Sequence, residues 1–148
     1  MQHESPGGGS GSSIPDLARR AKAAAPALGV ADRTTKDAAL RAAAERLVAD
    51  VGAVLAANAT DVARAEADGT PSGVVDRLRL DEGRVLAMAS GLRQVADLDD
   101  PVGSVTAEWS RPNGLRMSKV RVPLGVVAII YENRPNVTSD AFGLCLKA

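Results

Sequence analysis

The chain has 148 residues, enough for one domain, and its 18 basic and 18 acidic side chains leave no net charge. This balance argues against nucleic acids and anionic membranes as partners, because both are bound through an excess of positive charge. Hydrophobic residues make up 45% of the chain but aromatic residues only 2%, so alanine, valine and leucine must build the core through close helix packing. The composition is typical of a globular, helix-rich protein.

The sequence contains one cysteine, Cys145, and one histidine, His3. A single cysteine cannot form an internal disulfide, and these two residues provide no cluster of metal ligands. No apolar run approaches the roughly 20 residues that a membrane-spanning helix needs, and the N-terminus lacks the apolar core of a signal peptide. We therefore expect a soluble cytoplasmic protein without a metal site.

Residues 1–13 are rich in glycine and serine, and we expect this leader to be disordered because it cannot bury enough apolar surface to fold. Helical patterns fill residues 14–98. The first helix has Pro15 in its first turn and should end over residues 26–29, which begin with proline and finish with glycine.

The next segment has the clearest helical periodicity of the chain. Thr34 and Asp37 have the spacing of a capping box, in which two side chains bind backbone N–H groups of the first turn. An apolar stripe with helical spacing then predicts one continuous helix. Its buried face should carry Leu40, Ala44, Leu47, Val48, Val51, Val54 and Leu55. Asn58 or Thr60 can cap a short third helix that Gly69 ends.

Asp81 should cap a fourth helix, which ends over residues 97–101. This helix also has an apolar stripe at helical spacing. The stripe comprises Val85, Met88, Ala89, Leu92, Val95 and Ala96. Four helices thus precede any strand, and we interpret their stripes as core rather than as ligand-binding surface.

Asn113 and Gly114 are typical of a two-residue type I′ turn, which needs positive φ at both central residues. With this loop, Glu108 would face Lys119, an opposite-charge pair that supports the register. One face of the hairpin would then be apolar. That face would carry Val105, Ala107, Trp109, Val120 and Val122. We expect this arm, residues 104–122, to contact another subunit, and packing on its own domain is the alternative.

Residues 125–131 form an almost wholly apolar run with four β-branched residues, typical of a strand buried on both faces in a parallel sheet. The polarity then reverses, and a helix begins near Thr138. Residues 125–148 therefore read as a βα unit, whose corner binds anions at the helix N-terminus. Arg134 and Asn136 would lie at this corner.

The predicted strand has no predicted neighbours, and a single strand cannot form a sheet. The helical pattern also continues to residue 148 without a glycine or proline to end it. We therefore expect the chain to be the front portion of a larger α/β enzyme domain.

Five motifs carry a resemblance to a known family. They are Asp-Pro-Val-Gly at 100–103, Arg-Pro-Asn-Gly-Leu at 111–115, Val-Pro-Leu-Gly-Val at 122–126, Ile-Tyr-Glu-Asn-Arg-Pro-Asn-Val-Thr at 130–138 and Leu-Cys-Leu-Lys at 144–147. On these residues the chain closely resembles the γ-glutamyl phosphate reductases, or glutamate-5-semialdehyde dehydrogenases, which are proline-biosynthesis members of the aldehyde dehydrogenase superfamily. The resemblance runs from about Ile14 to the last residue.

The resemblance implies a truncated aldehyde dehydrogenase-like α/β fold. Its parts would be N-terminal helices, a β-hairpin arm, and the first strand and helix of a Rossmann-like cofactor domain. The implied activity is NADPH-dependent reduction of L-glutamyl 5-phosphate to L-glutamate 5-semialdehyde. A homo-oligomer formed through residues 104–122 and an association with glutamate 5-kinase are also implied.

In this family a cysteine thiolate attacks the acyl phosphate, phosphate leaves, and hydride reduces the resulting thioester. The resemblance places that cysteine beyond Ala148, so this chain carries no catalytic residue and should be inactive alone. We expect Cys145 to be a buried structural residue, because its apolar sequence neighbours offer no base or cation to activate a thiol.

The best site candidates within the chain are Arg134 and Asn136, which we assign to substrate binding. A guanidinium group suits a carboxylate or phosphate, and an amide N–H group can hold a substrate oxygen. The alternative is that Arg134 forms an ion pair and Asn136 caps the helix. We assign Glu132 and Asn133 to the nicotinamide side of the cofactor site.

Two other functions compete with the reductase. The helices and arm could form a non-enzymatic interaction module with a dimerising hairpin, which predicts that the 148 residues alone are monodisperse and unfold cooperatively. A simple dinucleotide-binding domain is disfavoured, because no Gly-x-Gly-x-x-Gly motif follows the predicted strand.

Overall fold

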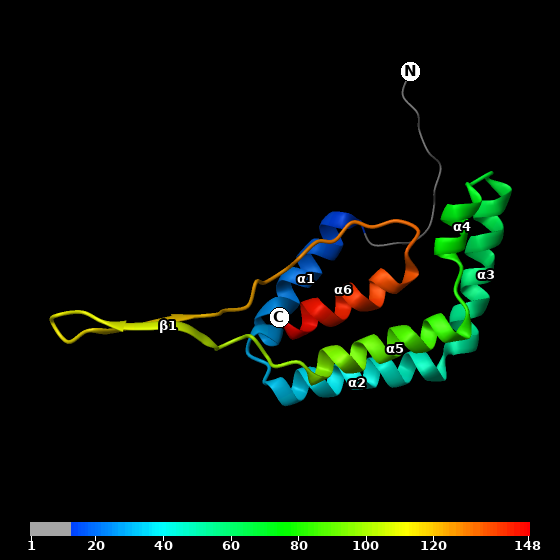
Figure 1. Cartoon of the computed structure of the whole chain (residues 1–148). Coiled ribbons are helices and arrows are strands. Elements are labelled where there is room, and N and C mark those ends of the chain that lie inside the picture. Colours follow the sequence, from blue (N-terminus) through cyan, green and yellow to red (C-terminus); the bar gives the residue numbers. More distant parts are fainter. Residues whose placement is uncertain (1–12) are drawn as a thin grey trace, which may run out of the picture.

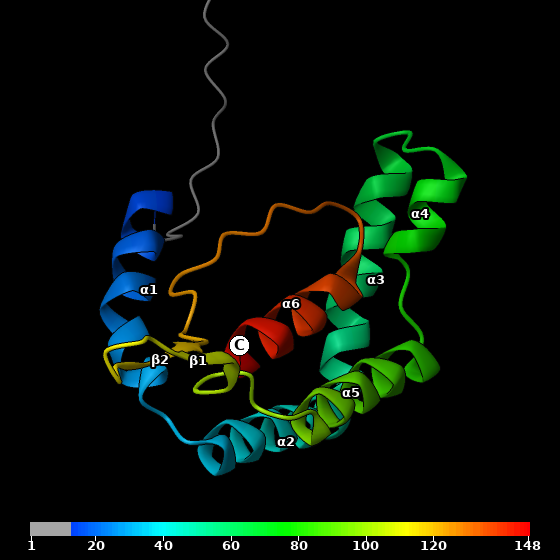
Figure 2. The ribbon, with the colours of Figure 1, turned by 60° about the vertical axis from the view of Figure 1, so that its left-hand side comes forward.

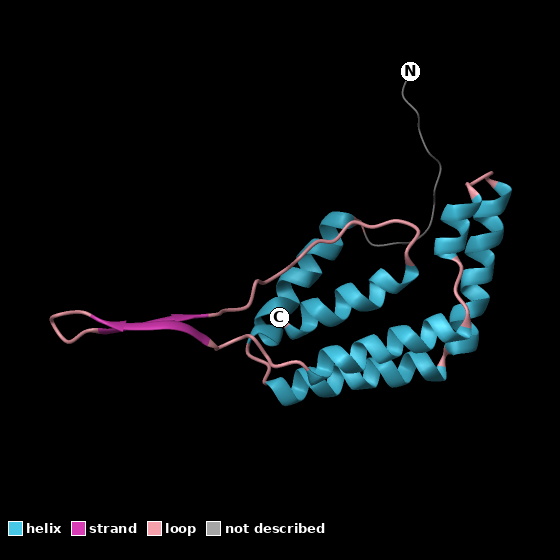
Figure 3. Cartoon of the chain, viewed as in Figure 1, coloured by secondary structure: helices cyan, strands magenta, loops and turns pink. Residues whose placement is uncertain are grey.

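The computed structural model describes residues 13–148 as a helical body from which one β-hairpin projects (Figure 1; Figure 3). The elements are α1 (Ile14–Gly29), α2 (Arg33–Ala49), α3 (Val51–Ala67), α4 (Ser72–Leu78), α5 (Glu82–Asp97), β1 (Val105–Ser110), β2 (Arg116–Val120) and α6 (Pro135–Lys147). Helices, arm and last helix follow in the predicted order. No helix within residues 13–148 combines the length and the apolar character needed to cross a bilayer.

Helix α1 begins as predicted, with Pro15 in its first turn. Ser13, which the sequence assigned to the disordered leader, is its N-cap: the Oγ atom accepts a hydrogen bond from the Asp16 N–H group. The rest of that leader lies outside the described residues. The helix ends at Gly29, within the predicted range of residues 26–29, and Pro26 lies inside it. Proline removes one helical hydrogen bond, and this helix, which buries none of its residues, tolerates the loss at its surface.

The predicted long second helix is two helices, α2 and α3, which meet at Asp50 and run in different directions (Figure 2). The cap of α2 is Asp32 rather than Thr34: its carboxylate accepts the Thr35 N–H group at 2.8 Å. The apolar periodicity continues across the break, so it could not reveal the change of direction. Only the first part of the stripe, Leu40 and Ala44, is fully buried.

Asn58 does not cap a helix but lies buried within α3. Its amide donates to the carbonyl of Leu78 at 2.9 Å and accepts the N–H group of Leu80 at 2.7 Å. Asn58 thereby fixes the chain directly after α4, a short helix that the sequence analysis did not predict.

The prediction for α5 is confirmed. The Asp81 carboxylate accepts the Arg84 N–H group at 2.7 Å at its N-terminus. Its stripe is buried against α2 and α6, and the central cluster is Leu40, Ala44, Ala89, Leu92 and Ala96. Helix α6 packs closely on α5 at Gly143, where an added Cβ atom would lie 2.9 Å from Cδ2 of Leu92. Small side chains thus allow the close packing that the composition predicts.

Two buried lysines hold the C-terminal end of α6 on the body. Lys147 donates to the carboxylate of Asp37 on α2 and, at 2.9 Å, to the carbonyl of Ala96 on α5. Lys36 lies 3.0 Å from the carboxylate of Asp100 and 3.3 Å from the Lys147 carbonyl. Each buried ammonium group therefore has a carboxylate partner, as burial of charge requires.

The hairpin forms, but its predicted register was wrong by one residue. Ser110 pairs with Arg116 and Glu108 with Ser118 rather than with Lys119. The loop has three residues instead of two, because Pro112 favours the second position of a type I turn and only Gly114 takes a positive φ, of 85°. The shift places Trp109 opposite Met117, and a bulge near Val105 shifts the pairing again.

The predicted doubly buried strand at residues 125–131 is not formed. The segment runs between the hairpin and α6 as neither helix nor strand, with exposed side chains, and Ile130 is fully exposed (Figure 1). The physical reason is a lack of partners. Among residues 13–148 the only strands are β1 and β2, and they pair with each other.

Candidate functional site

The predicted polar corner leads directly into α6. Arg134 is the N-cap residue of this helix and Pro135 occupies its first turn. Asn133 adopts a left-handed conformation with φ of 53°, which turns the chain sharply before the helix. The Tyr131 hydroxyl and the Thr138 Oγ atom are 2.6 Å apart and share a hydrogen bond that fastens the incoming segment to the first helical turn.

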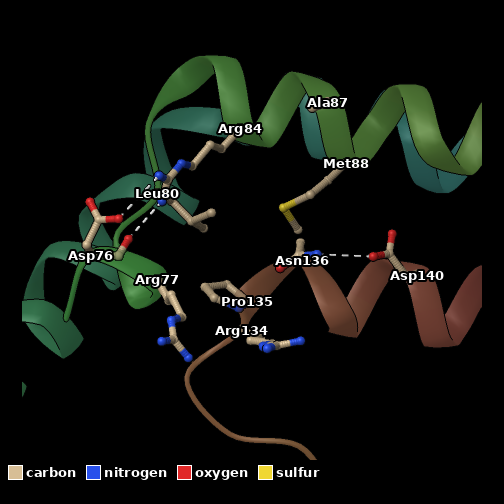
Figure 4. Close-up of a pocket in the computed structure, with 10 residues that line it drawn as sticks. All are labelled: Asp76, Arg77, Leu80, Arg84, Ala87, Met88, Arg134, Pro135, Asn136 and Asp140. Carbon is tan, nitrogen blue, oxygen red and sulfur yellow. Dashed lines mark hydrogen bonds and ion pairs between the residues drawn. The ribbon is translucent and has the colours of Figure 1, made fainter. Parts of the chain in front are cut away.

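A pocket of about 600 Å³ lies where this corner faces α4 and the start of α5 (Figure 4). Its apolar wall comes from Leu80, Ala87, Met88 and Pro135. Its polar lining is charged, apart from one amide. The polar residues are Asp76, Arg77, Arg84, Arg134, Asn136 and Asp140.

The three arginines of the pocket differ in what they already bind. Arg84 donates to the carbonyls of Asp76 at 2.9 Å and Arg79 at 2.5 Å, and its guanidinium lies 4.0 Å from the Asp76 carboxylate. The guanidinium groups of Arg77 and Arg134 make no hydrogen bond or ion pair with any described residue, and Figure 4 shows them on the same side of Pro135. The pocket therefore presents two uncommitted guanidinium groups, each able to bind a carboxylate or phosphate through two parallel hydrogen bonds.

Asn136 contributes an amide to the same pocket. Its Nδ2 atom donates to the Asp140 carboxylate at 3.2 Å, one helical turn further along α6. This contact orients the amide but uses only one of its two N–H groups. Neither part of the alternative reading is found: Asn136 does not cap α6, and Arg134 has no ion pair within residues 13–148.

The structure thus brings Arg134 and Asn136 together at one pocket, whereas Glu132 and Asn133 precede it and do not line it. The residues that face them, Arg77 among them, were not predicted, because α4 was not predicted. The signal was present: Val74, Val75 and Leu78 have helical spacing directly after Pro71.

The expectation for Cys145 was wrong in one respect, because this residue is exposed rather than buried. It lies on the side of α6 turned away from α5. There it lines a second cavity, of about 220 Å³, together with residues of α1 and Leu124 and Val127.

Comparisons with known proteins identify relatives of the chain. No protein-family model matches it. It is 54% identical over 131 residues to the gamma-glutamyl phosphate reductase of Thermoanaerobacter pseudethanolicus, an alignment that covers 88% of this chain and 32% of that protein. It is 51% identical over 146 residues to the protein of the same name from Mesorhizobium japonicum, covering 99% of this chain and 34% of the relative.

Solved structures give the same result. The crystal structure of gamma-glutamyl phosphate reductase from Thermotoga maritima matches with a TM-score of 0.88 and 38% identity, over 92% of this chain and 33% of that one. The Saccharomyces cerevisiae enzyme matches with a TM-score of 0.84 and 31% identity, over 91% and 35%. These matches confirm the resemblance predicted from the motifs. The chain spans about a third of the length of the curated relatives it matches.

Proposed function

We propose that this chain provides the front third of an NADP-dependent glutamate-5-semialdehyde dehydrogenase. This oxidoreductase reduces L-glutamyl 5-phosphate to L-glutamate 5-semialdehyde in proline biosynthesis. The likeness to gamma-glutamyl phosphate reductases over nearly the whole chain is the observation that carries the proposal. The pocket supports it, because two uncommitted guanidinium groups suit a substrate with more than one anionic group.

In this proposal Arg134 binds the phosphate group of the substrate. Its guanidinium is exposed, lacks a partner within residues 13–148 and stands at the N-terminus of α6, where the helix dipole also favours an anion. Holding the phosphate there orients the acyl carbon and stabilises the charge on the departing group.

Asn136 donates its free amide N–H group to the oxygen of the acyl group under attack. Negative charge develops on that oxygen when a nucleophile adds, so a donor fixed in advance lowers the barrier. The hydrogen bond to Asp140 keeps the amide in place and requires no reorganisation during the reaction.

The cofactor NADPH supplies the hydride when it is bound. Glu132 and Asn133, which we assign to its nicotinamide side, offer a carboxylate and an amide and so fit polar contacts to that ring. The negative charge of the Glu132 carboxylate repels phosphate, so in this proposal the cofactor phosphates bind elsewhere in the full-length protein.

The nucleophilic cysteine lies outside this chain in our proposal. Cys145 is exposed, but it stands nine residues along α6 from Asn136. At about 1.5 Å per residue this separates them by roughly 14 Å, too far for both to act on one acyl group. The 148 residues alone should therefore be inactive.

A full-length version of the protein, extended to the length of its relatives, tests the role of Arg134. Arg134→Ala should raise the KM for L-glutamyl 5-phosphate or reduce turnover, lowering kcat/KM roughly 10- to 100-fold, the loss expected for charged hydrogen bonds of about 1.5–3 kcal/mol. Steady-state kinetics with NADPH consumption as readout measures this. Arg79→Ala, which removes a guanidinium that pairs with Glu66 outside the pocket, is the matched control. Unchanged kinetics in Arg134→Ala would remove this residue from the site.

We further propose that the hairpin joins subunits of a homo-oligomer. Its projection from the body and the exposure of Trp109, Met117, Val105 and Val120 support this role (Figure 1). An association with glutamate 5-kinase and a cytoplasmic location remain predictions.

A further inference from the structure

The pocket holds a second cation that the assignment of Arg134 leaves unused. Arg77 comes from α4, on the opposite side of the pocket from the start of α6 (Figure 4). It is exposed and binds no other described residue, whereas Arg84 beside it is held by two carbonyls. Arg77 is therefore available to a ligand and contributes nothing visible to the fold.

Hydrogen bonds from α3 and α5 fix the position of α4. Asn58 binds the carbonyl of Leu78 and the N–H group of Leu80, and Arg84 binds the carbonyls of Asp76 and Arg79. Four hydrogen bonds thus fix the backbone on both sides of Arg77. Because the backbone of α4 is fixed in this way, the Arg77 side chain reaches the pocket at a defined place, as specific binding requires.

The proposed substrate has two anionic ends, the phosphate on the reacting acyl group and the α-carboxylate at the other end of a five-carbon chain. One guanidinium cannot hold both. The pocket has two uncommitted guanidinium groups, one from α4 and one from the start of α6, and the Asp140 carboxylate further along α6 can accept from an ammonium group. Two guanidinium groups and one carboxylate in the same pocket complement an amino acid that carries two anionic groups and one ammonium group.

We propose that Arg77 binds the α-carboxylate of the substrate and makes the enzyme selective for an α-amino acid aldehyde over a simple aldehyde. This inference rests on the proposed function and adds a specificity residue to it. Arg134 holds the phosphate end, and Arg77 holds the end remote from the chemistry.

The experiment uses a full-length version of the protein in the reverse direction, in which aldehyde, inorganic phosphate and NADP give acyl phosphate and NADPH. L-glutamate 5-semialdehyde is compared with 4-aminobutanal, which differs from it by lack of the α-carboxylate. The variants are Arg77→Ala, Arg77→Lys and the control Arg79→Ala. Arg79 lies directly after the same helix, but its side chain pairs with Glu66 at 2.8 Å, outside the pocket.

Arg77→Ala should lower kcat/KM for L-glutamate 5-semialdehyde about 10- to 100-fold, mainly through KM, as expected when a charged hydrogen-bonding pair is lost. Its KM for phosphate and its kcat/KM for 4-aminobutanal should not change. The kcat/KM of Arg77→Lys for L-glutamate 5-semialdehyde should lie between those of wild type and Arg77→Ala. Lysine keeps the positive charge but lacks the planar guanidinium that binds a carboxylate through two hydrogen bonds. Arg79→Ala should behave as wild type.

Equal losses on both aldehydes, an increased KM for phosphate, or wild-type kinetics in Arg77→Ala would each overturn the assignment of Arg77. A wild-type protein that does not oxidise L-glutamate 5-semialdehyde would instead overturn the proposed function, and the inference with it. The two failures are therefore distinguishable.

Discussion

Gly143 determines how closely α6 can approach α5. Any side chain there would meet the Cδ2 atom of Leu92 at 2.9 Å, with Leu40 and Val95 just beyond. Leu92 is itself buried in the central cluster and has little room to move. Gly52, in α3, is the opposite case, because nothing lies within 4 Å of an added Cβ atom.

Gly143→Ala should therefore destabilise the chain, because overpacking of about 1–3 kcal/mol outweighs a gain in helix propensity of about 0.5–1 kcal/mol. Gly52→Ala makes the same chemical change without the clash and should stabilise by up to about 1 kcal/mol. Urea unfolding of both variants, followed by far-ultraviolet circular dichroism, measures the free energies. An equal stabilisation by the two alanines would show that α6 is not closely packed at Gly143.

Single residues were the hardest features to predict. The positions of Arg134 and Asn136 at a helix start followed from a local change of polarity, and the structure places both at one pocket. Asn58 and Arg77 were missed because their partners lie across the fold, and local sequence carries no record of such contacts. Cys145 was expected to be buried from its apolar neighbours, but neighbours in sequence do not decide which side of a helix is covered.

At the scale of elements, the attachment of α6 to α2 depends on a titratable pair. The hydrogen bond from Lys147 keeps the pKa of Asp37 below its usual value. Burial raises the pKa of Asp100, but hydrogen bonds from the Val102 N–H group and Lys36 outweigh it, so this pKa is also lowered. A carboxyl group with a lowered folded-state pKa stabilises the fold at pH values above its unfolded pKa, about 3.9.

The contribution of Asp37 should accordingly be complete near neutral pH and should disappear as the pH falls through its lowered folded-state value. Urea midpoints measured from neutral to strongly acidic pH should fall more steeply for wild type than for Asp37→Asn, which cannot titrate at this position. The difference isolates Asp37 from the other carboxyl groups. Parallel curves would mean that the Lys147 bond contributes no pH-dependent stability.

Hydrophobic periodicity predicted a helix well where one face of that helix is buried, as in α5. It predicted poorly where the chain changes direction between two helices, as between α2 and α3. The hairpin was predicted from its turn residues, but Pro112 selected a longer loop and shifted the register. The strand at 125–131 was predicted from its apolar, β-branched composition, which is typical of strands buried in a sheet. The absence of predicted neighbouring strands had already indicated that residues 125–131 would lack sheet partners among the described residues.

At the scale of the whole molecule, the proposed contact between subunits depends on the exposed hairpin. Trp109 and Met117 lie opposite each other, both partly exposed, whereas Glu108 and Ser118 form the adjacent, polar pair. A surface that combines aromatic and methionine side chains is typical of the centre of a subunit interface.

Trp109→Lys in the full-length protein should consequently reduce the oligomer to smaller species, because it places a charge within an apolar contact. Ser118→Lys adds the same charge to the same arm from the polar pair and should leave the assembly intact. Light scattering coupled to size-exclusion chromatography measures both masses. An unchanged mass in Trp109→Lys would show that this pair does not contact another subunit.

The uncovered segment at 125–131 also has a consequence for biosynthesis. Helices α2, α5 and α6 can pack on one another as soon as they leave the ribosome, and in a protein of the relatives' length about two thirds of the chain would still have to be translated. At roughly 5–20 residues per second, translation of the remaining two thirds lasts on the order of tens of seconds. Throughout that interval Ile130 and its neighbours present an extended apolar peptide, the kind of target that chaperones bind on nascent chains.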